Sequence, residues 1–362
     1  MIAPPRDEAG FADAIREASD SHRALRFRGG GSKDFYGERL EGEVLDTRGF
    51  SGLVEYDPTE LVVSARCGTP LAELEALLGE RGQMLAFEPP HFGAAATVGG
   101  MVAAGLSGPR RAAAGAVRDY VLGATVMDGQ GRSLRFGGRV MKNVAGYDIS
   151  RLMAGSLGTL ALILEVSLKT LPRPAAESTR CLELSLEASL QALNGWSGRG
   201  LPVSASAWRD GKLHVRLSGT GSAVSSALGI VGGEDLEGEH ADAFWKALRD
   251  QSGPFFRSNA PLWRVSLPAS ASADSLAGVS GEVLIEWGGA LRWLRSDASA
   301  ARIREAAAQA GGHAALFRCA GEVARRNVFH PLPSALMNLH RRLKQAFDPR
   351  GIFNPARMYP DF

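Results

Sequence analysis

The sequence predicts an α+β protein of two domains, and three observations lead to this prediction. Short alternating segments typical of strands recur between segments whose apolar residues have helical spacing. With 362 residues, of which 45% are hydrophobic and 22% charged, the chain is long enough to form two cores. Residues 171–178 are rich in proline and polar side chains and lack any period, which predicts a hinge between the domains.

The first half is predicted to begin with an amphipathic helix and to continue mainly in short strands. Phe11, Ile15 and Ala18 give residues 8–19 one apolar face. Thr69 is expected to cap a second helix, which has Pro70 at its first position and ends at Gly82. Strands are expected at residues 24–27, 44–46, 53–56, 61–65, 120–127, 132–136 and 159–169, with a turn at 128–131 and a short helix at 149–154.

Three consecutive glycines follow the first predicted strand, in the stretch Arg-Gly-Gly-Gly-Ser-Lys at residues 28–33. A backbone without Cβ atoms can turn sharply and bring successive amide groups close to an anion. The stretch is neither G-x-x-x-x-G-K-[ST] nor a G-x-G-x-x-G that opens a helix, since residues 34–37 have no helical period. It indicates a phosphate or pyrophosphate site of another kind, with a surface turn as the alternative.

Small residues dominate the segment from residue 93 to residue 108. Such density lets the backbone pack against a large flat group, for which a ring system with its ribityl chain is the natural candidate. A tight helix crossing without a ligand is the alternative. Two more glycine-rich segments, at residues 137–148 and 155–158, follow predicted elements of the same domain. This number of glycine-rich turns exceeds what the fold needs for its bends and favours a ligand.

The second half is predicted to be an α+β cap with antiparallel strands beneath helices. Strands are expected at residues 181–186, 203–208, 213–217, 262–267, 282–287, 291–294 and 314–318, and helices at 188–193, 243–248 and 298–310. Residues 219–222 are glycine-rich and polar and are predicted to form a loop. Near the C-terminus, Leu332, Leu336, Leu339, Leu343 and Phe347 form one face of a helix, a stripe typical of a core-facing helix.

Composition excludes several classes of function. A net charge of +2 provides no bulk field that would attract nucleic acid. Cys67, Cys181 and Cys319 form no C-x-x-C pair, which argues against an iron–sulfur cluster or zinc site and favours a reducing, cytoplasmic setting. No two histidines are spaced as a metal pair, so no metal is expected. No signal peptide or membrane-spanning run is evident either.

An ordered series of motifs carries a family resemblance. These motifs are Arg-Gly-Gly-Gly-Ser at 28–32, Thr-Val-Gly-Gly-Met-Val-Ala at 97–103, Val-Arg-Asp-Tyr-Val-Leu-Gly at 117–123, Lys-Asn-Val-Ala-Gly-Tyr-Asp at 142–148 and Gly-Ser-Leu-Gly-Thr at 155–159. They resemble the PCMH-type FAD-binding domain of the vanillyl-alcohol oxidase and para-cresol methylhydroxylase family. With Glu-Trp-Gly-Gly-Ala-Leu-Arg-Trp at 286–293 and Phe-Asp-Pro-Arg-Gly-Ile-Phe-Asn-Pro at 347–355, the likeness extends to the FAD-binding subunits of bacterial glycolate oxidases.

The resemblance implies a domain plan and a set of partners. It implies a two-subdomain FAD-binding domain over residues 1–172, an α+β cap over 173–330, and a helix and tail over 331–362 that return to the FAD domain. In such complexes the subunit accompanies a larger FAD-binding subunit and an iron–sulfur subunit, and glycolate, a small 2-hydroxy acid, is oxidised to glyoxylate. A cytoplasmic chain is expected, with peripheral attachment to the inner membrane through its partners as the alternative.

The resemblance also implies which residues bind the cofactor. The first loop would hold the pyrophosphate, the second stretch the ribityl and isoalloxazine side, and later residues the adenosine half. The implied FAD-binding residues are Arg28, Gly29, Gly30, Gly31, Ser32, Lys33, Thr97, Val98, Gly99, Gly100, Ser107, Gly115, Arg118, Asp119, Ile163 and Asn354. Many relatives attach FAD covalently through a histidine. Here Ser32 and Lys33 stand where the glycine-loop histidine would be, and His91 is interpreted as a polar residue at a loop bend. FAD is therefore expected to bind without a covalent bond.

Oxidation of a 2-hydroxy acid requires an arginine for the carboxylate and a base for the hydroxyl proton. Arg264 and Arg292 are the preferred candidates for the arginine, and Arg325 and Arg326 are further ones. Trp263, Trp287 and Trp293 could form the wall of such a pocket. All of these residue types are also common in surface or packing positions. No candidate base stands out, and the histidine-rich metal signature of the larger flavin subunits is absent.

Three functional hypotheses therefore remain open. The chain is a flavoprotein subunit of a 2-hydroxy-acid dehydrogenase whose substrate site lies in a partner, or a stand-alone FAD enzyme for another alcohol or hydroxy acid. In the third hypothesis it is a mainly structural subunit with the same fold.

Overall fold

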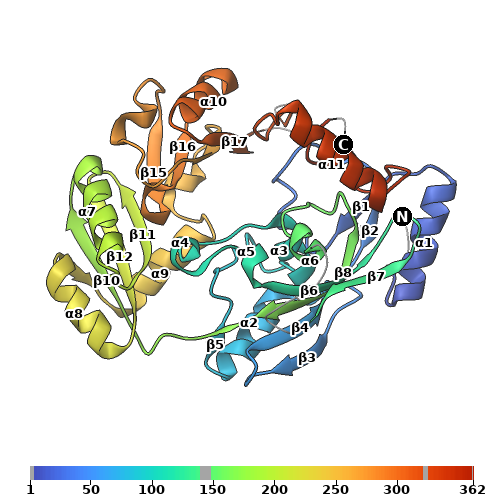
Figure 1. Cartoon of the computed structure of the whole chain (residues 1–362), viewed down its shortest axis with the longest axis horizontal. Coiled ribbons are helices and arrows are strands. Elements are labelled where there is room, and N and C mark those ends of the chain that lie inside the picture. The colour runs from blue at the N-terminus through green and yellow to red at the C-terminus, as the bar shows by residue number, and fades with distance from the viewer. Residues whose placement is uncertain (1–3, 139–147, 321–324, 361) are drawn as a thin grey trace.

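The computed structural model describes residues 4–138, 148–320, 325–360 and 362 and shows two α+β halves side by side (Figure 1). A five-stranded sheet organises the first half and an eight-stranded sheet the second. Of the motif at residues 142–148, residues 142–147 lie outside the described residues. Residues 173–175 separate the two sheets, because β9 (Leu171–Pro172) ends the first half and β10 (Ala176–Glu183) begins the second. The predicted hinge at 171–178 is thus much shorter than expected.

The five-stranded sheet is antiparallel throughout and has the order β3-β4-β8-β6-β7. Its strands are β3 (Leu53–Asp57), β4 (Val62–Arg66), β6 (Val121–Met127), β7 (Ser133–Gly137) and β8 (Leu162–Lys169). Two small pairs lie beside it: β1 (Leu25–Arg28) runs parallel to β2 (Glu43–Asp46), and β5 (Gln83–Met84) runs antiparallel to β9. Buried aliphatic side chains of β4, β6 and β8 form the core of this half.

The helices of the first half are short, apart from the first two. They are α1 (Glu8–Asp20), α2 (Leu71–Glu80), α3 (Val98–Ala104), α4 (Arg111–Ala114), α5 (Val117–Tyr120) and α6 (Ile149–Leu152). Asp7 caps α1, which buries Phe11, Ile15 and Ala18 as predicted. The predicted cap of α2 is wrong. Pro70 occupies the N-cap position, and the Thr69 hydroxyl instead accepts from the Gly52 N–H and donates to its C=O.

The eight-stranded sheet of the second half is also antiparallel, with the order β13-β10-β12-β11-β15-β16-β14-β17. Besides β10, its strands are β11 (Val203–Arg209), β12 (Lys212–Gly219), β13 (Glu234–Leu236), β14 (Leu262–Ser266), β15 (Glu282–Glu286), β16 (Leu291–Arg295) and β17 (His313–Arg318). Its helices are α7 (Leu186–Gly198), α8 (Gly221–Val231), α9 (Gly238–Arg249) and α10 (Ala300–Gln309), with 3₁₀ turns at Pro254–Arg257, Ala273–Leu276 and Trp287–Gly289.

The two faces of this sheet have different neighbours. Side chains of α7, α8 and α10 pack on one face, whereas α9 and loops of the first half cover the other. The prediction of a loop at residues 219–222 is wrong, because Thr220 accepts from the Ala223 N–H and caps α8. A Gly-Thr-Gly-Ser segment that ends a strand and begins a helix looks like a turn by composition alone.

Near the C-terminus, α11 (Ser334–Phe347) lies along the edge of the first half beside β1 (Figure 1). The predicted core stripe on this helix is wrong in its first part: Leu336 is 46% and Leu339 is 51% exposed. Only the last turn is buried, through Lys344 and Phe347. The tail then runs back along β1, where the Asn354 N–H donates to the Leu25 C=O.

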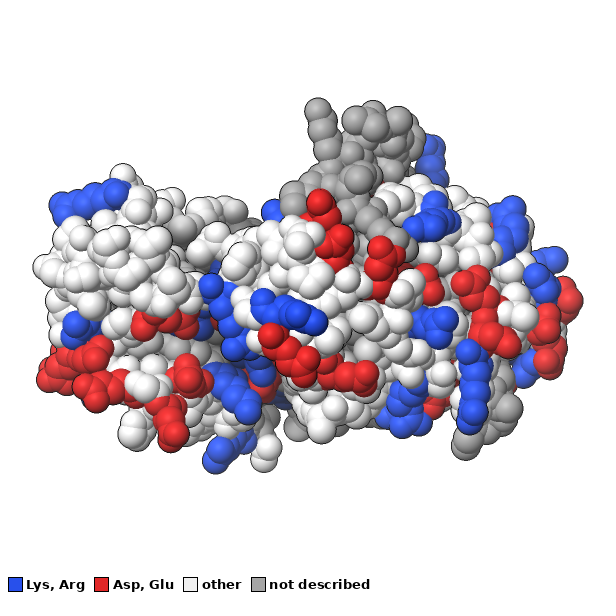
Figure 2. Space-filling view, turned by 90° about the horizontal axis from the view of Figure 1, so that it is seen from below, with Lys and Arg blue, Asp and Glu red and all other residues white. Residues whose placement is uncertain are grey.

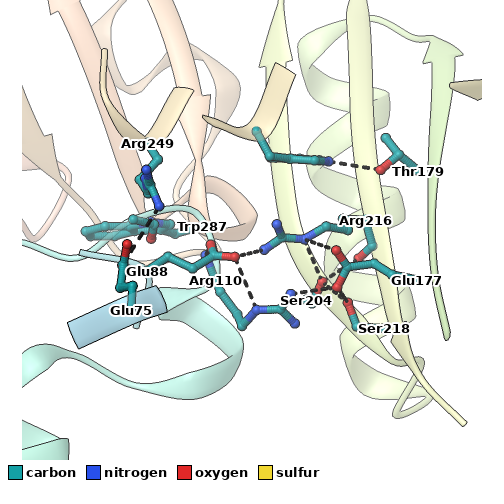
Figure 3. Close-up of polar contacts among 12 residues, drawn as sticks. Glu75, Glu88, Arg110, Glu177, Thr179, Ser204, Arg216, Ser218, Arg249 and Trp287 are labelled. Carbon is teal, nitrogen blue, oxygen red and sulfur yellow. Dashed lines mark hydrogen bonds and ion pairs between the residues drawn. The ribbon is translucent and has the colours of Figure 1, made fainter. Parts of the chain in front are cut away.

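A buried network of ion pairs joins the two halves (Figure 3). Glu88 of the first half accepts from Arg110 at 3.3 Å and from Arg216 of β12 at 2.7 Å. Arg110 also reaches Glu177 of β10, at 2.6 Å. The side chains of Arg110 and Arg216 are only 9% and 6% exposed, so these charges are held largely away from water. The network therefore links the second half to the first at a defined position.

Candidate functional site

A cavity lies beside the glycine stretch that follows β1. It contains about 660 Å³ of space, part of which is open to solvent. The predicted residues that line it are Arg28, Gly29, Gly30, Gly31, Ser32, Lys33, Thr97, Gly100 and Asn354. The loop, the helix α3 and the C-terminal tail, which are far apart in sequence, thus meet around one space.

The glycines of the first loop are required by close contacts within the protein. A Cβ on Gly29 would lie 2.3 Å from the Thr97 hydroxyl, and one on Gly30 would lie 1.5 Å from the carbonyl oxygen of Ala95. Gly31 has a positive φ of 71°, which favours glycine. The loop at residues 28–33 is therefore clamped against the segment that leads into α3, and its main-chain geometry is fixed before any ligand binds.

Two polar side chains hold the walls of the cavity in place. The amide of Asn354 accepts from the Phe27 N–H at 2.8 Å and donates to the Leu157 C=O at 2.6 Å. Thr97 caps α3 by accepting from the Gly100 N–H at 3.3 Å. The placement of Asn354 beside the loop follows from the bonding of the tail along β1.

Positive charge is concentrated around this cavity. Arg28 pairs with Asp34 at 2.9 Å, and burial lowers the pKa of Lys33 to about 8 even though Asp250 opposes the shift. Burial also lowers the pKa of Arg357 to about 10, and its guanidinium donates to carbonyl groups of residues 34–38. The buried Nε of Arg26 has no hydrogen-bond partner. An anion bound here would pair with basic groups whose charge the protein neutralises only in part.

The residues present fit FAD. Gly100 supports this fit independently of charge: a Cβ there would meet only the Thr97 hydroxyl, at 3.2 Å, and otherwise would extend into the cavity. Arg28, Lys33 and the amides of the loop would hold the pyrophosphate, while Gly100, Ala103 and Ala104 would provide a flat wall. When bound, FAD supplies two-electron redox chemistry.

The other implied FAD residues do not line this cavity. Val98 and Gly99 face the core of the first half, where a Cβ on Gly99 would lie 2.6 Å from Cys67. Ile163 of β8 is 4% exposed within the same core. The remaining four, Ser107, Gly115, Arg118 and Asp119, lie around α4 and α5. The Ser107 hydroxyl accepts from the Val117 N–H, and Asp119, which lies next to Gly115, accepts from the Ala116 N–H. The side chain of Arg118 is exposed.

His91 has a partner other than a ligand. Its Nε2 lies 2.8 Å from a carboxylate oxygen of Glu75, and its backbone N–H donates to Asp250. It lines a wide cleft between the halves rather than the first cavity, and Ser32 lines both spaces. This arrangement is consistent with the bend residue expected there, and non-covalent binding of FAD stays a prediction.

A second, smaller cavity lies between the two halves. Leu106, Ser107 and Gly108, directly after α3, form one side, and Arg264, Glu286, Trp287 and Trp293 of the cap sheet are among the residues of the other side. The Trp287 indole N–H donates to the Gly108 C=O at 3.0 Å and closes the wall. The structure therefore brings Arg264, Trp287 and Trp293 together, as the sequence analysis required for a pocket beside the cofactor.

Arg292 is not brought to this cavity, and its role as a carboxylate ligand needs correction. It lies on the opposite face of the sheet, is 1% exposed, and donates to the carbonyl groups of Ala271 and Ala273. Strand alternation explains the difference, because neighbours in β16 point to opposite faces. The other three candidates do not line this cavity either. Trp263 faces the same side of the sheet as Arg292. Arg325 donates to the Asp34 C=O, and the side chain of Arg326 is exposed.

Sequence reasoning missed two residues near Arg264. Glu286, which lines this cavity, begins the Glu-Trp-Gly-Gly motif but carries no signal of its own as a single acidic residue. Tyr36 comes near Arg264 only because the two halves pack together, whereas Glu286 belongs to the same sheet as Arg264. Among the described residues, no cluster of three or more His, Cys, Asp or Glu side chains could hold a metal ion, and no helix is long and apolar enough to cross a membrane.

Charged side chains of both signs are interspersed over the face of the molecule shown in Figure 2. Basic side chains also line the clefts between the halves, among them Arg173 and Arg249, together with Glu75. The clefts thus carry mixed charge.

Comparison with known proteins places this architecture in a family. The sequence model of a family described as FAD binding domain matches residues 1–137. The chain is 47% identical to glycolate oxidase subunit GlcE of Escherichia coli over 349 residues, which is 96% of each chain. It is 33% identical to a D-lactate dehydrogenase of Archaeoglobus fulgidus over 48% of this chain and 39% of the relative. It is 30% identical to glycolate oxidase subunit GlcD of Bacillus subtilis over 42% of this chain and 33% of the relative.

Solved structures agree on the fold. Two structures of alkyldihydroxyacetonephosphate synthase match 98% of this chain with TM-scores of 0.69 and 0.67, at 15% and 16% sequence identity, and the chain covers 75% and 76% of them. The predicted α+β class with a PCMH-type FAD-binding domain is confirmed, and the cofactor of the family is FAD. The chain belongs to the glycolate oxidase subunit GlcE family of FAD-dependent oxidoreductases.

Proposed function

We propose that this chain is the FAD-binding subunit of a glycolate oxidase complex that oxidises glycolate, a small 2-hydroxy acid, to glyoxylate. Electrons would pass to an iron–sulfur subunit, and a larger FAD-binding subunit would complete the complex. The observation that carries the proposal is 47% identity to a glycolate oxidase subunit over 96% of both chains. The cationic cavity beside residues 28–33 supports it, since it fits the dinucleotide.

The residues of this chain would perform distinct tasks. The loop at residues 28–33 and Gly100 would hold FAD, and Asn354 would keep the loop in register with the tail. The Trp287–Gly108 hydrogen bond and the Glu88 network would hold the cap over the cofactor and exclude water from the space between the halves. Such pre-organised positioning is the contribution that a protein makes to flavin chemistry.

Expression of the chain with and without its neighbouring subunits tests the proposal. We expect the assembled complex, purified through a tag on this chain, to reduce an artificial electron acceptor in the presence of glycolate. The same purification should recover a larger flavoprotein and an iron–sulfur protein. A chain that purifies alone from cells containing both candidate partners, or a complex inert toward 2-hydroxy acids, would contradict the proposal.

A further inference from the structure

The cavity between the halves has the features of an acid-binding site within this chain. The space spans about 350 Å³, part of which is open to solvent, and it is lined by aromatic side chains around three ionisable groups, Arg249, Arg264 and Glu286. It lies next to the cofactor cavity: Ala103 and Ala104 at the end of α3 line the first space, and Leu106 and Ser107 line the second. A small molecule bound here would therefore lie beside the site that fits FAD.

The strand register places the two ionisable groups on one face of the sheet. Arg264 of β14 is paired with Trp293 of β16, and Glu286 of β15 is paired with Leu291, two residues before Trp293. Residues paired across strands share a face, and so do residues two apart along a strand. Arg264 and Glu286 therefore flank Trp293 on the side that faces the first half.

Arg264 is available to bind a carboxylate. In the part of the chain that the structure describes, no carboxylate oxygen lies within 4.0 Å of its guanidinium. The guanidinium instead lies among uncharged aromatic groups: it is 5.3 Å from the ring centroid of Trp287, and its charge is close enough to the Tyr36 hydroxyl to oppose the rise that burial causes in the pKa of Tyr36. An arginine held in this way keeps its planar fork free for a bidentate acid.

Glu286 is a buried carboxyl group whose charge is not neutralised by direct contact. It is 4% exposed, and its Oε1 accepts from the Trp293 indole N–H at 2.7 Å. Burial raises the pKa of Glu286 to about 8, although the Trp293 hydrogen bond and the charge of Arg264 oppose the shift and Glu88 adds to it. Two further basic side chains lie nearby: Arg249 lines the cavity, and the Arg111 guanidinium lies 4.5 Å from the ring centroid of Trp287. A pKa near the working pH suits a proton acceptor.

We propose that this cavity is a 2-hydroxy-acid site of this chain, in which Arg264 binds the carboxylate and Glu286 accepts the proton of the hydroxyl group. The inference rests on the proposed function for its substrate class. For glycolate, the O–H bond breaks, its proton goes to Glu286, and its electron pair becomes the second C–O bond of glyoxylate. FAD held in the neighbouring cavity would supply the two-electron oxidant that takes one hydrogen of C2 with its electron pair.

Reduction of the flavin in the isolated, FAD-loaded chain tests this inference. The chain is mixed with glycolate without oxygen, and the flavin absorbance is followed in wild type, Glu286→Gln, Arg264→Gln and Glu282→Gln. Glu282 lies on the same strand with an exposed side chain and is the matched control. Because glutamine can still accept from Trp293, Glu286→Gln preserves the packing and removes only the ionisation. We expect it to slow flavin reduction by about 100-fold or more, while Glu282→Gln reacts like wild type.

Binding provides a readout that is independent of turnover. Oxalate, which carries no oxidisable hydrogen, is titrated while the fluorescence of the tryptophans in the cavity is recorded. We expect Arg264→Gln to weaken oxalate binding by roughly 10- to 100-fold. In wild type the affinity should fall above about pH 8, where Glu286 becomes negative, and Glu286→Gln should remove this fall.

The outcomes separate this inference from the proposed function. If the assembled complex oxidises glycolate but glycolate does not reduce the flavin of the isolated chain, the inference is overturned and the proposed function stands. Equal reduction rates in wild type and Glu286→Gln, or oxalate binding that is unaffected by Arg264→Gln, would also overturn it. An assembled complex inert toward glycolate contradicts the proposed function, whereas oxalate binding that requires Arg264 would still support an acid site here.

Discussion

At the residue scale, the cofactor cavity depends on basic groups that are held partly out of water. Lys33 is the clearest case, because burial outweighs the attraction of Asp250 and lowers the pKa of its amine to about 8. Among the residues that the structure describes, its Nζ hydrogen-bonds only at long distances, to the Ser32 hydroxyl at 3.4 Å and to the His91 C=O at 3.3 Å. A pyrophosphate nearby would stabilise the charged form and raise the pKa again.

This shift predicts that FAD binding depends on pH. In the free protein Lys33 loses its proton above about pH 8, so binding above this pH must take up a proton. The affinity for FAD should therefore be constant below pH 8 and fall by up to about tenfold per pH unit above it. Titration of apoprotein with FAD from pH 6.5 to 9.5 measures this.

Lys33→Gln should bind FAD roughly 10- to 100-fold more weakly at pH 7 and lose the dependence on pH. Lys212→Gln, on the exposed end of β12, is the control and should keep the wild-type profile. A profile for Lys33→Gln that matches wild type would show that Lys33 does not contact the bound anion.

At the element scale, the site forms where a strand, a short helix and the C-terminal tail meet. The sequence predicted the elements that carry the glycine-rich loops, because hydrophobic period and glycine are local signals. It could not show that Gly29 and Gly30 face Thr97 and Ala95, since that contact joins segments more than 60 residues apart. Two local predictions were wrong because tertiary context decided them. The segment predicted as a loop at residues 219–222 begins α8. The predicted core stripe of α11 leaves Leu336 and Leu339 exposed because of where this helix packs.

The contacts of the glycines identify the informative variant. Gly30→Val would strike the Ala95 carbonyl and disturb the loop with or without a cofactor. Gly100→Val, by contrast, places its methyl groups in the cavity from a helical backbone position. We expect Gly100→Val to lower FAD affinity by roughly 10- to 100-fold, with little change in the thermal stability of the apoprotein.

Gly195→Val provides the matched control, because Gly195 lies in α7 with open space where its Cβ would be. It should bind FAD as wild type does. Full FAD occupancy in purified Gly100→Val would place the cofactor away from α3.

At the scale of the whole molecule, the position of the cap over the first half is fixed by buried polar contacts. Arg110 and Glu88 come from one half, and Arg216 and Glu177 from the other. Sequence alone offers no sign of this network, because its members are ordinary charged residues distributed from position 88 to position 216. The same is true of Tyr36, whose contact with Arg264 joins the two halves, and of Glu286, which the strand register of the cap sheet places on the same face as Arg264. Such contacts are tertiary and have no local pattern.

Removal of one member should leave the others as uncompensated buried charges. We expect Arg216→Met to lower the free energy of unfolding by about 3–5 kcal/mol in urea denaturation. Arg151→Met, which removes an exposed ion pair with Asp148, should cost less than about 1 kcal/mol. If Glu88→Gln is added to Arg216→Met, part of the loss should be recovered, because the unpaired carboxylate is removed. Equal costs for the two single variants would contradict a buried, coupled network.

The central claim is that the first half of the chain holds FAD without a covalent bond in the cavity between residues 28–33 and α3. Acid precipitation of the purified, flavin-saturated chain tests it most directly, with the flavin in the supernatant and in the pellet identified and quantified. The account predicts about one FAD per chain in the supernatant and none in the pellet. Flavin that stays with the precipitated protein, a different nucleotide in the supernatant, or a chain that cannot be saturated with FAD would contradict it.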